Sequence, residues 1–131
     1  MQALAFLNKA LAIAKSSKNQ EQKASLLNSI GFLYKEQEDY AQATAKFEES
    51  LAIHRLTQNP REESRVLLNL GVNKQRQAEY DDALVHFTVS LETAKVTDNL
   101  DVRIAAGEGI GVALALYIVH ERSLMIEELP M

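Results

Sequence analysis

The feature that most constrains this chain is a repeat of 40 residues. Gly31, Gly71 and Gly111 are 40 residues apart, and a leucine or isoleucine precedes each of them. Six further sets keep the same step: Ala3, Ala43 and Ala83; Leu7, Phe47 and Phe87; Ala10, Ser50 and Ser90; Leu11, Leu51 and Leu91; Asn19, Asn59 and Asn99; Tyr40 and Tyr80. Residues related by this step are called equivalent below. Because a fixed period of this size is the signature of stacked supersecondary units, the sequence predicts a repeat array.

Each repeat predicts two helices. Residues 21–36 carry Leu27 and Ile30 among apolar residues at helical spacing, and residues 40–56 carry a second apolar series with the same period. The polar segment 37–39 separates the two. We therefore expect each unit to be a hairpin of antiparallel helices.

The whole chain then predicts an all-α solenoid of about six helices. We expect an unpaired second helix at 1–18, complete repeats at 20–58 and 60–98, and a last helix at 100–128. The last helix is expected to be long and to cap the array, because no polar break appears near Tyr117. Pro60 fits the first turn of a helix, where its missing N–H costs little.

Small residues mark where two helices of a hairpin come close. Gly31 is expected on the inner side of its helix, with Ala43 and Ser50 on the facing helix. Large residues such as Phe47 then fill the space between layers. One hairpin cannot bury its apolar face alone, so each must stack on the next.

Composition narrows the classes of partner. The chain is 47% hydrophobic, and its formal net charge of -4 argues against nucleic acid, which favours basic surfaces. Without cysteine there is no disulfide or thiol chemistry, which is compatible with the cytoplasmic location we expect. No apolar run reaches the roughly 18 to 20 residues of a membrane span, the longest being 110–119, so no membrane partner is expected. The N-terminus is interpreted as an amphipathic helix rather than a signal peptide.

Candidate catalytic and metal-binding patterns are weak. His54, His86 and His120 are the only histidines, and none has a second histidine four residues away. Acidic pairs such as Glu62-Glu63 lie near helix ends, where they favour the helix dipole. We therefore expect no catalytic residue, no metal ion and no cofactor.

A cluster of glycines at 107–111 invites interpretation as a phosphate-binding loop. It follows no predicted strand and lacks the Lys-Ser/Thr pair, so we reject that interpretation. Gly111 is instead explained by the repeat. Gly107 and Gly109 are expected to permit close helix contact or to weaken that turn by about 1 kcal/mol each relative to alanine.

The repeat resembles the tetratricopeptide repeat, in its longer-period branch. The residues that carry the resemblance are Leu27, Ile30, Gly31, Tyr34, Tyr40, Ala43 and Phe47, which recur as Leu67, Leu70, Gly71, Tyr80, Ala83 and Phe87. The segment ESLAI at 49–53 is also typical of that branch. Lys74 departs from the pattern at the position equivalent to Tyr34, and Gly107 departs from it where Leu27 and Leu67 stand. The resemblance implies a right-handed, non-catalytic α-solenoid that binds protein partners.

The resemblance also implies a concave groove lined by the first helices, in which a peptide or protein partner lies. The residues expected to line it are Asn28, Phe32, Lys35, Glu36, Arg65, Leu68, Asn69, Val72, Arg76, Glu108, Val112 and Leu116. Asparagines can hydrogen-bond a peptide backbone, since an amide offers both a donor and an acceptor. Arginines can pair with acidic groups.

Two alternative functions remain open. One is self-association through the terminal helices, because residues 112–119 are apolar on every side, which a surface helix is not. A two-fold homodimer is one arrangement. The residues expected in such a contact are Leu4, Leu7, Leu11, Leu116, Tyr117 and Val119. The other is a sensory domain within a larger signalling protein.

Overall fold

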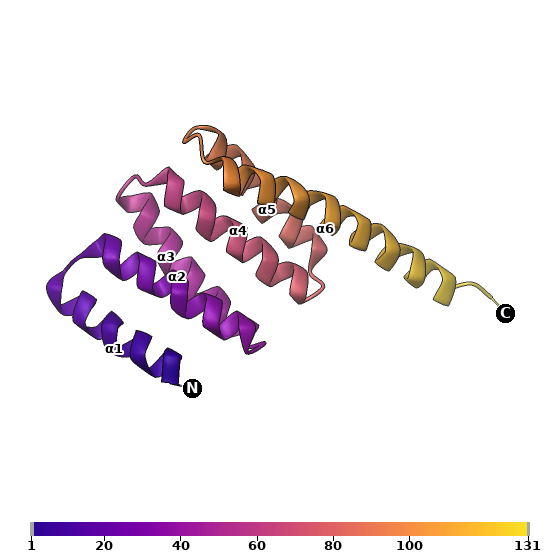
Figure 1. Ribbon diagram of the computed structural model, residues 1–131. Helices are drawn as coiled ribbons and strands as arrows, with labels where there is room; N and C mark the ends of the chain where they lie inside the picture. The colour runs from indigo at the N-terminus through magenta and orange to yellow at the C-terminus, as the bar shows by residue number, and fades with distance from the viewer. Residues whose placement is uncertain (1, 131) are drawn as a thin grey trace.

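The computed structural model describes residues 2–130, apart from the side chain of Ser17, and these residues form six helices and no strand. The helices are α1 (Gln2–Ser17), α2 (Gln20–Glu36), α3 (Tyr40–Leu56), α4 (Pro60–Arg76), α5 (Tyr80–Lys95) and α6 (Leu100–Glu127). Consecutive helices run antiparallel and stack side by side along the array (Figure 1). The prediction of an all-α solenoid with six helices and a long last helix is confirmed.

Asparagine and aspartate residues are the N-caps of α2, α3 and α4. The side chains of Asn19, Asp39 and Asn59 accept hydrogen bonds from backbone N–H groups three residues later, at 3.0, 3.3 and 3.3 Å. These side chains satisfy donors that a helix N-terminus leaves unpaired. Pro60 occupies the first turn of α4, as predicted.

Each tight turn contains one residue in the left-handed region, and none of these residues is glycine. They are Lys18, Glu38, Gln58, Ala78 and Asp98, with φ between 54° and 63°. A side chain in this region costs about 1–2 kcal/mol because its Cβ crowds the following carbonyl oxygen. The packed helices on either side hold each turn in this conformation.

Replacing Ala78 by glycine is therefore expected to raise the free energy of unfolding by about 0.5–1 kcal/mol. Glycine removes the Cβ strain at φ 61°, and the larger entropy of the unfolded chain offsets part of the gain. Urea unfolding followed by circular dichroism measures the change. The control is Ala45→Gly, at an exposed position inside α3, which should lose about 0.5–1 kcal/mol. An equal loss in both variants would contradict the prediction.

Glycine and phenylalanine make the close contact within each complete hairpin. A Cβ at Gly31 would lie 2.8 Å from the ring of Phe47, and a Cβ at Gly71 would lie 2.5 Å from the ring of Phe87. Real Cβ atoms do not approach so closely, so only glycine fits under each ring. The predicted inner position of Gly31 is confirmed.

Two serines add a hydrogen bond to the same interface. Ser50 Oγ donates to the carbonyl oxygen of Ala24 at 2.7 Å, and the equivalent Ser90 donates to the carbonyl of Ser64 at 2.7 Å. All four residues are fully buried. The serines thus do more than keep the helices close, because their hydroxyls also join the paired helices.

The last helix departs from this pattern. Gly111 is exposed, and a Cβ there or at Gly107 would meet no atom within 4 Å. Gly109 instead lies against Phe87, where a Cβ would be 2.8 Å from the ring. The expectation of a close helix contact is therefore confirmed for Gly109 and wrong for Gly107. Gly111 keeps its repeat position, but no phenylalanine ring lies over it. The reason is that no described helix follows α6 and packs back on it as α3 packs on α2.

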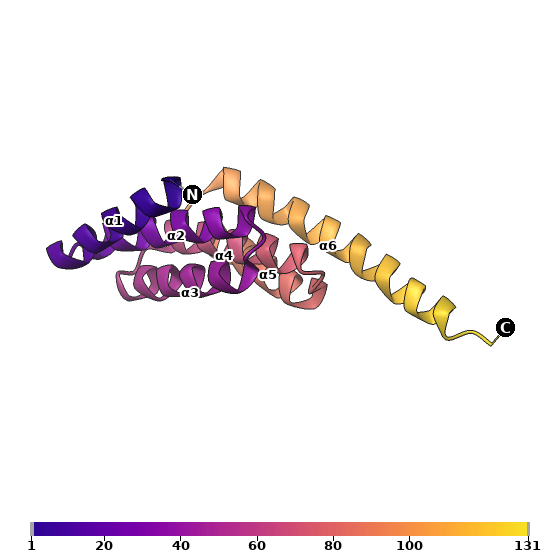
Figure 2. The ribbon, with the colours of Figure 1, turned by 90° about the horizontal axis from the view of Figure 1, so that it is seen from below.

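Only the first half of α6 contains buried residues. Val102, Ala106 and Ala113 are buried against the neighbouring helices, and residues 114–130 are all exposed. The second half runs straight out of the body (Figures 1 and 2). By length and composition α6 could cross a membrane, so the expectation that no segment is long and apolar enough is wrong. One such helix is weak evidence for a membrane protein.

Candidate peptide-binding groove

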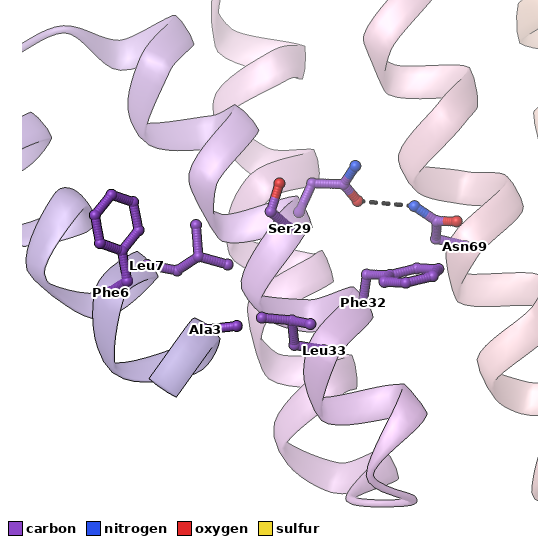
Figure 3. Close-up of a pocket in the computed structure, with 8 residues that line it drawn as sticks. Ala3, Phe6, Leu7, Ser29, Phe32, Leu33 and Asn69 are labelled. Carbon is purple, nitrogen blue, oxygen red and sulfur yellow. Dashed lines mark hydrogen bonds between the residues drawn. The ribbon is translucent and has the colours of Figure 1, made fainter. Parts of the chain in front are cut away.

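A pocket of about 540 Å³ lies where α1, α2 and α4 meet. Its lining residues are Ala3, Phe6, Leu7, Asn28, Ser29, Phe32, Leu33 and Asn69. Figure 3 shows the side chains of α1 on one side of the pocket and those of α2 and α4 on the other. The pocket thus joins the first helices of two successive repeats to the uncovered helix α1.

Two asparagines form the polar part of this pocket. Asn69 Nδ2 donates to Asn28 Oδ1 at 2.9 Å, which links α4 to α2 (Figure 3). That bond uses one group of each amide and leaves Asn28 Nδ2 as a donor and Asn69 Oδ1 as an acceptor. A peptide group offers the complementary acceptor and donor, so the pair can bind a peptide backbone.

The rest of the pocket is mainly apolar and aromatic. Phe6 is 71% exposed and Phe32 is 45% exposed, although both are large hydrophobic residues. Leu7 and Leu33 are half-buried beside them. Exposed apolar side chains gathered in a concavity generally mark an interaction site.

Lys35 was expected to line the groove, but it is 4% exposed. Its Nζ lies 4.4 Å from the centroid of the Phe32 ring and 3.9 Å from Glu36 Oε1. Burial lowers the pKa of Lys35, the charge of Arg76 lowers it further, and Glu36 opposes both. Lys35 is therefore placed to hold the Phe32 ring by a cation–π contact rather than to meet a ligand.

The two predicted groove arginines are engaged within the chain. Arg76 Nη1 lies 3.3 Å from Glu36 Oε1, and Arg65 Nη2 lies 3.3 Å from Asp101 Oδ2. Both pairs join the first helices of successive repeats and are partly exposed, so each stabilises the array only slightly. An acidic ligand would have to displace these carboxylates.

The other predicted groove residues are spread along the array. Leu68 and Val72 are half-buried and pack against the cluster around Phe87, between α4 and its neighbours. Val112 is 48% exposed on α6, where Glu108 is exposed as well. Of the residues expected to line the groove, the structure brings Asn28, Phe32 and Asn69 into one pocket.

The residues expected to mediate self-association fall into two groups. Leu4, Leu7 and Leu11 pack against α2, and Leu11 is a core residue at 6% exposure, not a surface residue. Leu116, Tyr117 and Val119 are exposed on α6.

Sequence reasoning missed four residues that line the pocket: Ala3, Phe6, Ser29 and Leu33. A signal for one of them existed in the repeat. Ala3 is equivalent to buried Ala43 and lies on the helix at 1–18 that was expected to be unpaired, so an uncovered face could be expected there. Phe6 lies beside that face.

The histidines show no metal-site geometry. His54 is 1% exposed, with Nδ1 3.5 Å from Glu21 Oε2, and the His120 ring meets Tyr80 edge-on at 6.1 Å. Across residues 2–130, no group of three or more His, Cys, Asp or Glu side chains could hold a metal ion.

Comparison with known proteins identifies the class to which this array belongs. The tetratricopeptide repeat model matches residues 1–55 and, in a second placement, residues 22–95. The chain therefore belongs to the tetratricopeptide repeat family, whose repeats generally mediate protein–protein interaction and are typically non-catalytic.

A solved structure supports the fold. The chain is similar to BtubC (BKLC) from P. vanneervenii, whose crystal structure superposes with a TM-score of 0.69 at 19% sequence identity. The match covers 98% of this chain and 59% of that chain, so this chain spans well under two thirds of its structural neighbour. At this identity the likeness shows the fold alone. A search of the curated proteins found no match.

Proposed function

We propose that this protein is a non-catalytic interaction module that binds an extended peptide segment of a protein partner in the groove between α1, α2 and α4. The observation that carries the proposal is the Asn28–Asn69 pair set among the exposed rings of Phe6 and Phe32. The amide pair supplies contacts to the peptide backbone, and the rings accept a bulky apolar side chain.

The test is selection from a displayed library of random linear peptides, followed by affinity measurement with labelled peptides. In the double variant Asn28→Ala/Asn69→Ala the affinity is expected to fall by about tenfold or more, because two hydrogen bonds of about 1 kcal/mol each are lost. Fluorescence anisotropy measures the affinity, and circular dichroism checks that the fold persists.

The matched control is Arg65→Ala, one helical turn from Asn69 on α4. Arg65 pairs with Asp101 and does not line the pocket, so its loss should change the affinity by less than about threefold. Equal affinity of the double variant and the unaltered protein would overturn the proposal. So would selection of no binding peptide.

We propose self-association through the terminal helices as a second function. It is favoured by the exposed apolar side chains of α6, such as Val112, Ile118 and Val119. Large exposed apolar patches are uncommon on monomers.

A further inference from the structure

The two ends of the array are incomplete in complementary ways. α1 is equivalent to α3 and α5, which are the second helices of hairpins. It packs on α2, as α3 packs on α4, yet no described first helix completes its own hairpin. α6 is equivalent to α2 and α4, which are first helices. It packs on α5, yet no described second helix completes its own hairpin. Each end therefore presents the face that the other end lacks.

Side-chain exposure shows the uncovered face of α1. Ala43 and Ala83 are 0% exposed inside complete hairpins, but the equivalent Ala3 is exposed. Phe47 is 0% exposed, but the equivalent Leu7 is only half-buried. Residues that form the interior of a hairpin elsewhere thus lie open on α1.

The matching face of α6 is open too. Gly31 and Gly71 are buried under phenylalanine rings, whereas Gly111 has no atom within 4 Å of its Cβ position. Ile104 is 54% exposed, although the equivalent Ala24 is 0% exposed. Nothing within residues 2–130 covers these α6 positions.

We infer that α6 of one copy packs antiparallel on α1 of a second copy and completes a hairpin across the two chains. This assignment goes beyond groove binding and gives the proposed self-association a definite register. Inside the chain each hairpin glycine meets the phenylalanine sixteen residues later. The residue sixteen positions after Gly111 is Glu127. Leu7 lies three 40-residue steps before Glu127, so Leu7 is its equivalent on α1. Gly111 of one copy therefore lies under Leu7 of the next.

The neighbouring contact in this register is apolar. In the complete hairpins a buried serine donates to the carbonyl of a small residue, as Ser50 does to Ala24. The equivalent positions across the two copies hold Ala10 and Ile104. Alanine replaces the serine, so no hydroxyl is left unpaired, and the larger Ile104 replaces the small Ala24. The two helices must therefore lie farther apart at this point than in a complete hairpin, and the contact there is apolar.

A polar contact supports the same register. Asn59 uses Oδ1 to cap α4 and donates from Nδ2 to Glu21 Oε2 at 2.9 Å. The residue equivalent to Asn59 is Asn19, whose Oδ1 caps α2. The residue equivalent to Glu21 is the exposed Asp101. In the inferred contact Asn19 Nδ2 of the second copy donates to Asp101, whose carboxylate can accept this bond as well as that from Arg65.

This contact is head-to-tail, so each added copy leaves one α1 face and one α6 face open. Such an interface builds open chains or closed rings rather than a two-fold dimer. α2 ends at Glu36 and α4 ends at the equivalent Arg76, just before the hairpin turn. α6 continues past Leu116, the residue equivalent to these two helix ends. The second half of α6 therefore runs past the end of the neighbouring α1.

The test measures solution mass by sedimentation equilibrium over a range of concentrations, without any peptide. Wild-type mass is expected to rise with concentration and to exceed twice the chain mass, without limit for open chains and up to a fixed multiple of the chain mass for closed rings. Ala3→Arg and Gly111→Arg should each remain monomeric alone, because each blocks one face. Both positions are exposed, so both variants should keep the helical content of the wild type, and neither should melt below the wild type in dilute solution, where the wild type is monomeric.

Mixing the two blocked variants gives the decisive result. The open α1 of Gly111→Arg should bind the open α6 of Ala3→Arg, and the mixture should stop at twice the chain mass. The control Ala5→Arg should associate like the wild type, since Ala5 and the equivalent Ala45 are both exposed.

Three outcomes would overturn the inference. They are a wild-type mass of one chain at every concentration, a mixture that stays monomeric, and dimerisation of Ala3→Arg alone, which would indicate a two-fold contact between α6 helices. Ala3 and Leu7 also line the groove, so association and peptide binding would compete for the same face of α1. The mass measurement contains no peptide, so its result is independent of the groove proposal.

Discussion

Replacing Phe87 by alanine is expected to lower the free energy of unfolding by about 3–5 kcal/mol, the largest loss we expect from a single substitution. The ring is 1% exposed, and it lies against both Gly71 of α4 and Gly109 of α6. One side chain therefore holds three helices together. The glycines opposite have no side chains that could fill the space left by the ring, so a cavity remains.

Thermal unfolding followed by circular dichroism should show a melting temperature lower by about 10–20 °C. Stacked repeats can unfold separately, so hydrogen exchange should locate the loss of protection in α4, α5 and α6 rather than in α2. The control is Val85→Ala, two residues earlier on α5 and 60% exposed, which should change stability by less than about 0.5 kcal/mol. A loss below about 1 kcal/mol for Phe87→Ala would contradict the inferred role of the ring.

Replacing Gly71 by leucine is the substitution with the second largest expected effect. The new Cβ would lie 2.5 Å from the Phe87 ring, so α4 and α5 must move apart, at a cost of about 1–3 kcal/mol. Gly31→Leu should cost a similar amount, because its Cβ would lie 2.8 Å from Phe47. Urea unfolding gives the free energies.

Gly111→Leu is the matched control for this effect. It is equivalent to Gly71 in the repeat, but its Cβ position is open. In dilute solution leucine there should stabilise the helix by up to about 1 kcal/mol, because glycine is a poor helix former. Equal losses at Gly71 and Gly111 would mean that helix propensity rather than packing decides the effect.

The double variant Gly71→Leu/Phe87→Ala separates the two mechanisms. Leucine at position 71 would occupy part of the space that the ring vacates, so the double variant should be more stable than the two separate losses predict. Strict additivity would show that the two positions do not share one space.

Several features of the fold follow from the sequence because they depend on short-range pattern. The 40-residue step predicted the helices, and it also predicted that Gly31 faces the second helix of its hairpin. The recurrence of Asn19 and Asn59 at the repeat step has a local cause, because each side chain caps the helix that follows within three residues. A periodic pattern is enough for such contacts, since each is made again in every repeat.

The turns and the groove were less accessible from sequence. Lys18 and Ala78 adopt a positive φ although neither is a typical left-handed residue, since the packed helices on both sides impose the turn. Lys35 is polar, yet it is buried beside Phe32, and Arg76 pairs with Glu36. Such contacts depend on the relative placement of two helices, which residue type alone does not reveal.

Sequence alone thus determined the family, the order of the helices and the inner position of Gly31 within its hairpin. Only the tertiary structure decided which repeat positions have a partner. Gly111 occupies the same repeat position as Gly71, yet one glycine is open and the other lies under a ring. The physical reason is that burial depends on the presence of a neighbouring helix. The same residue is therefore core inside the array and surface at its end.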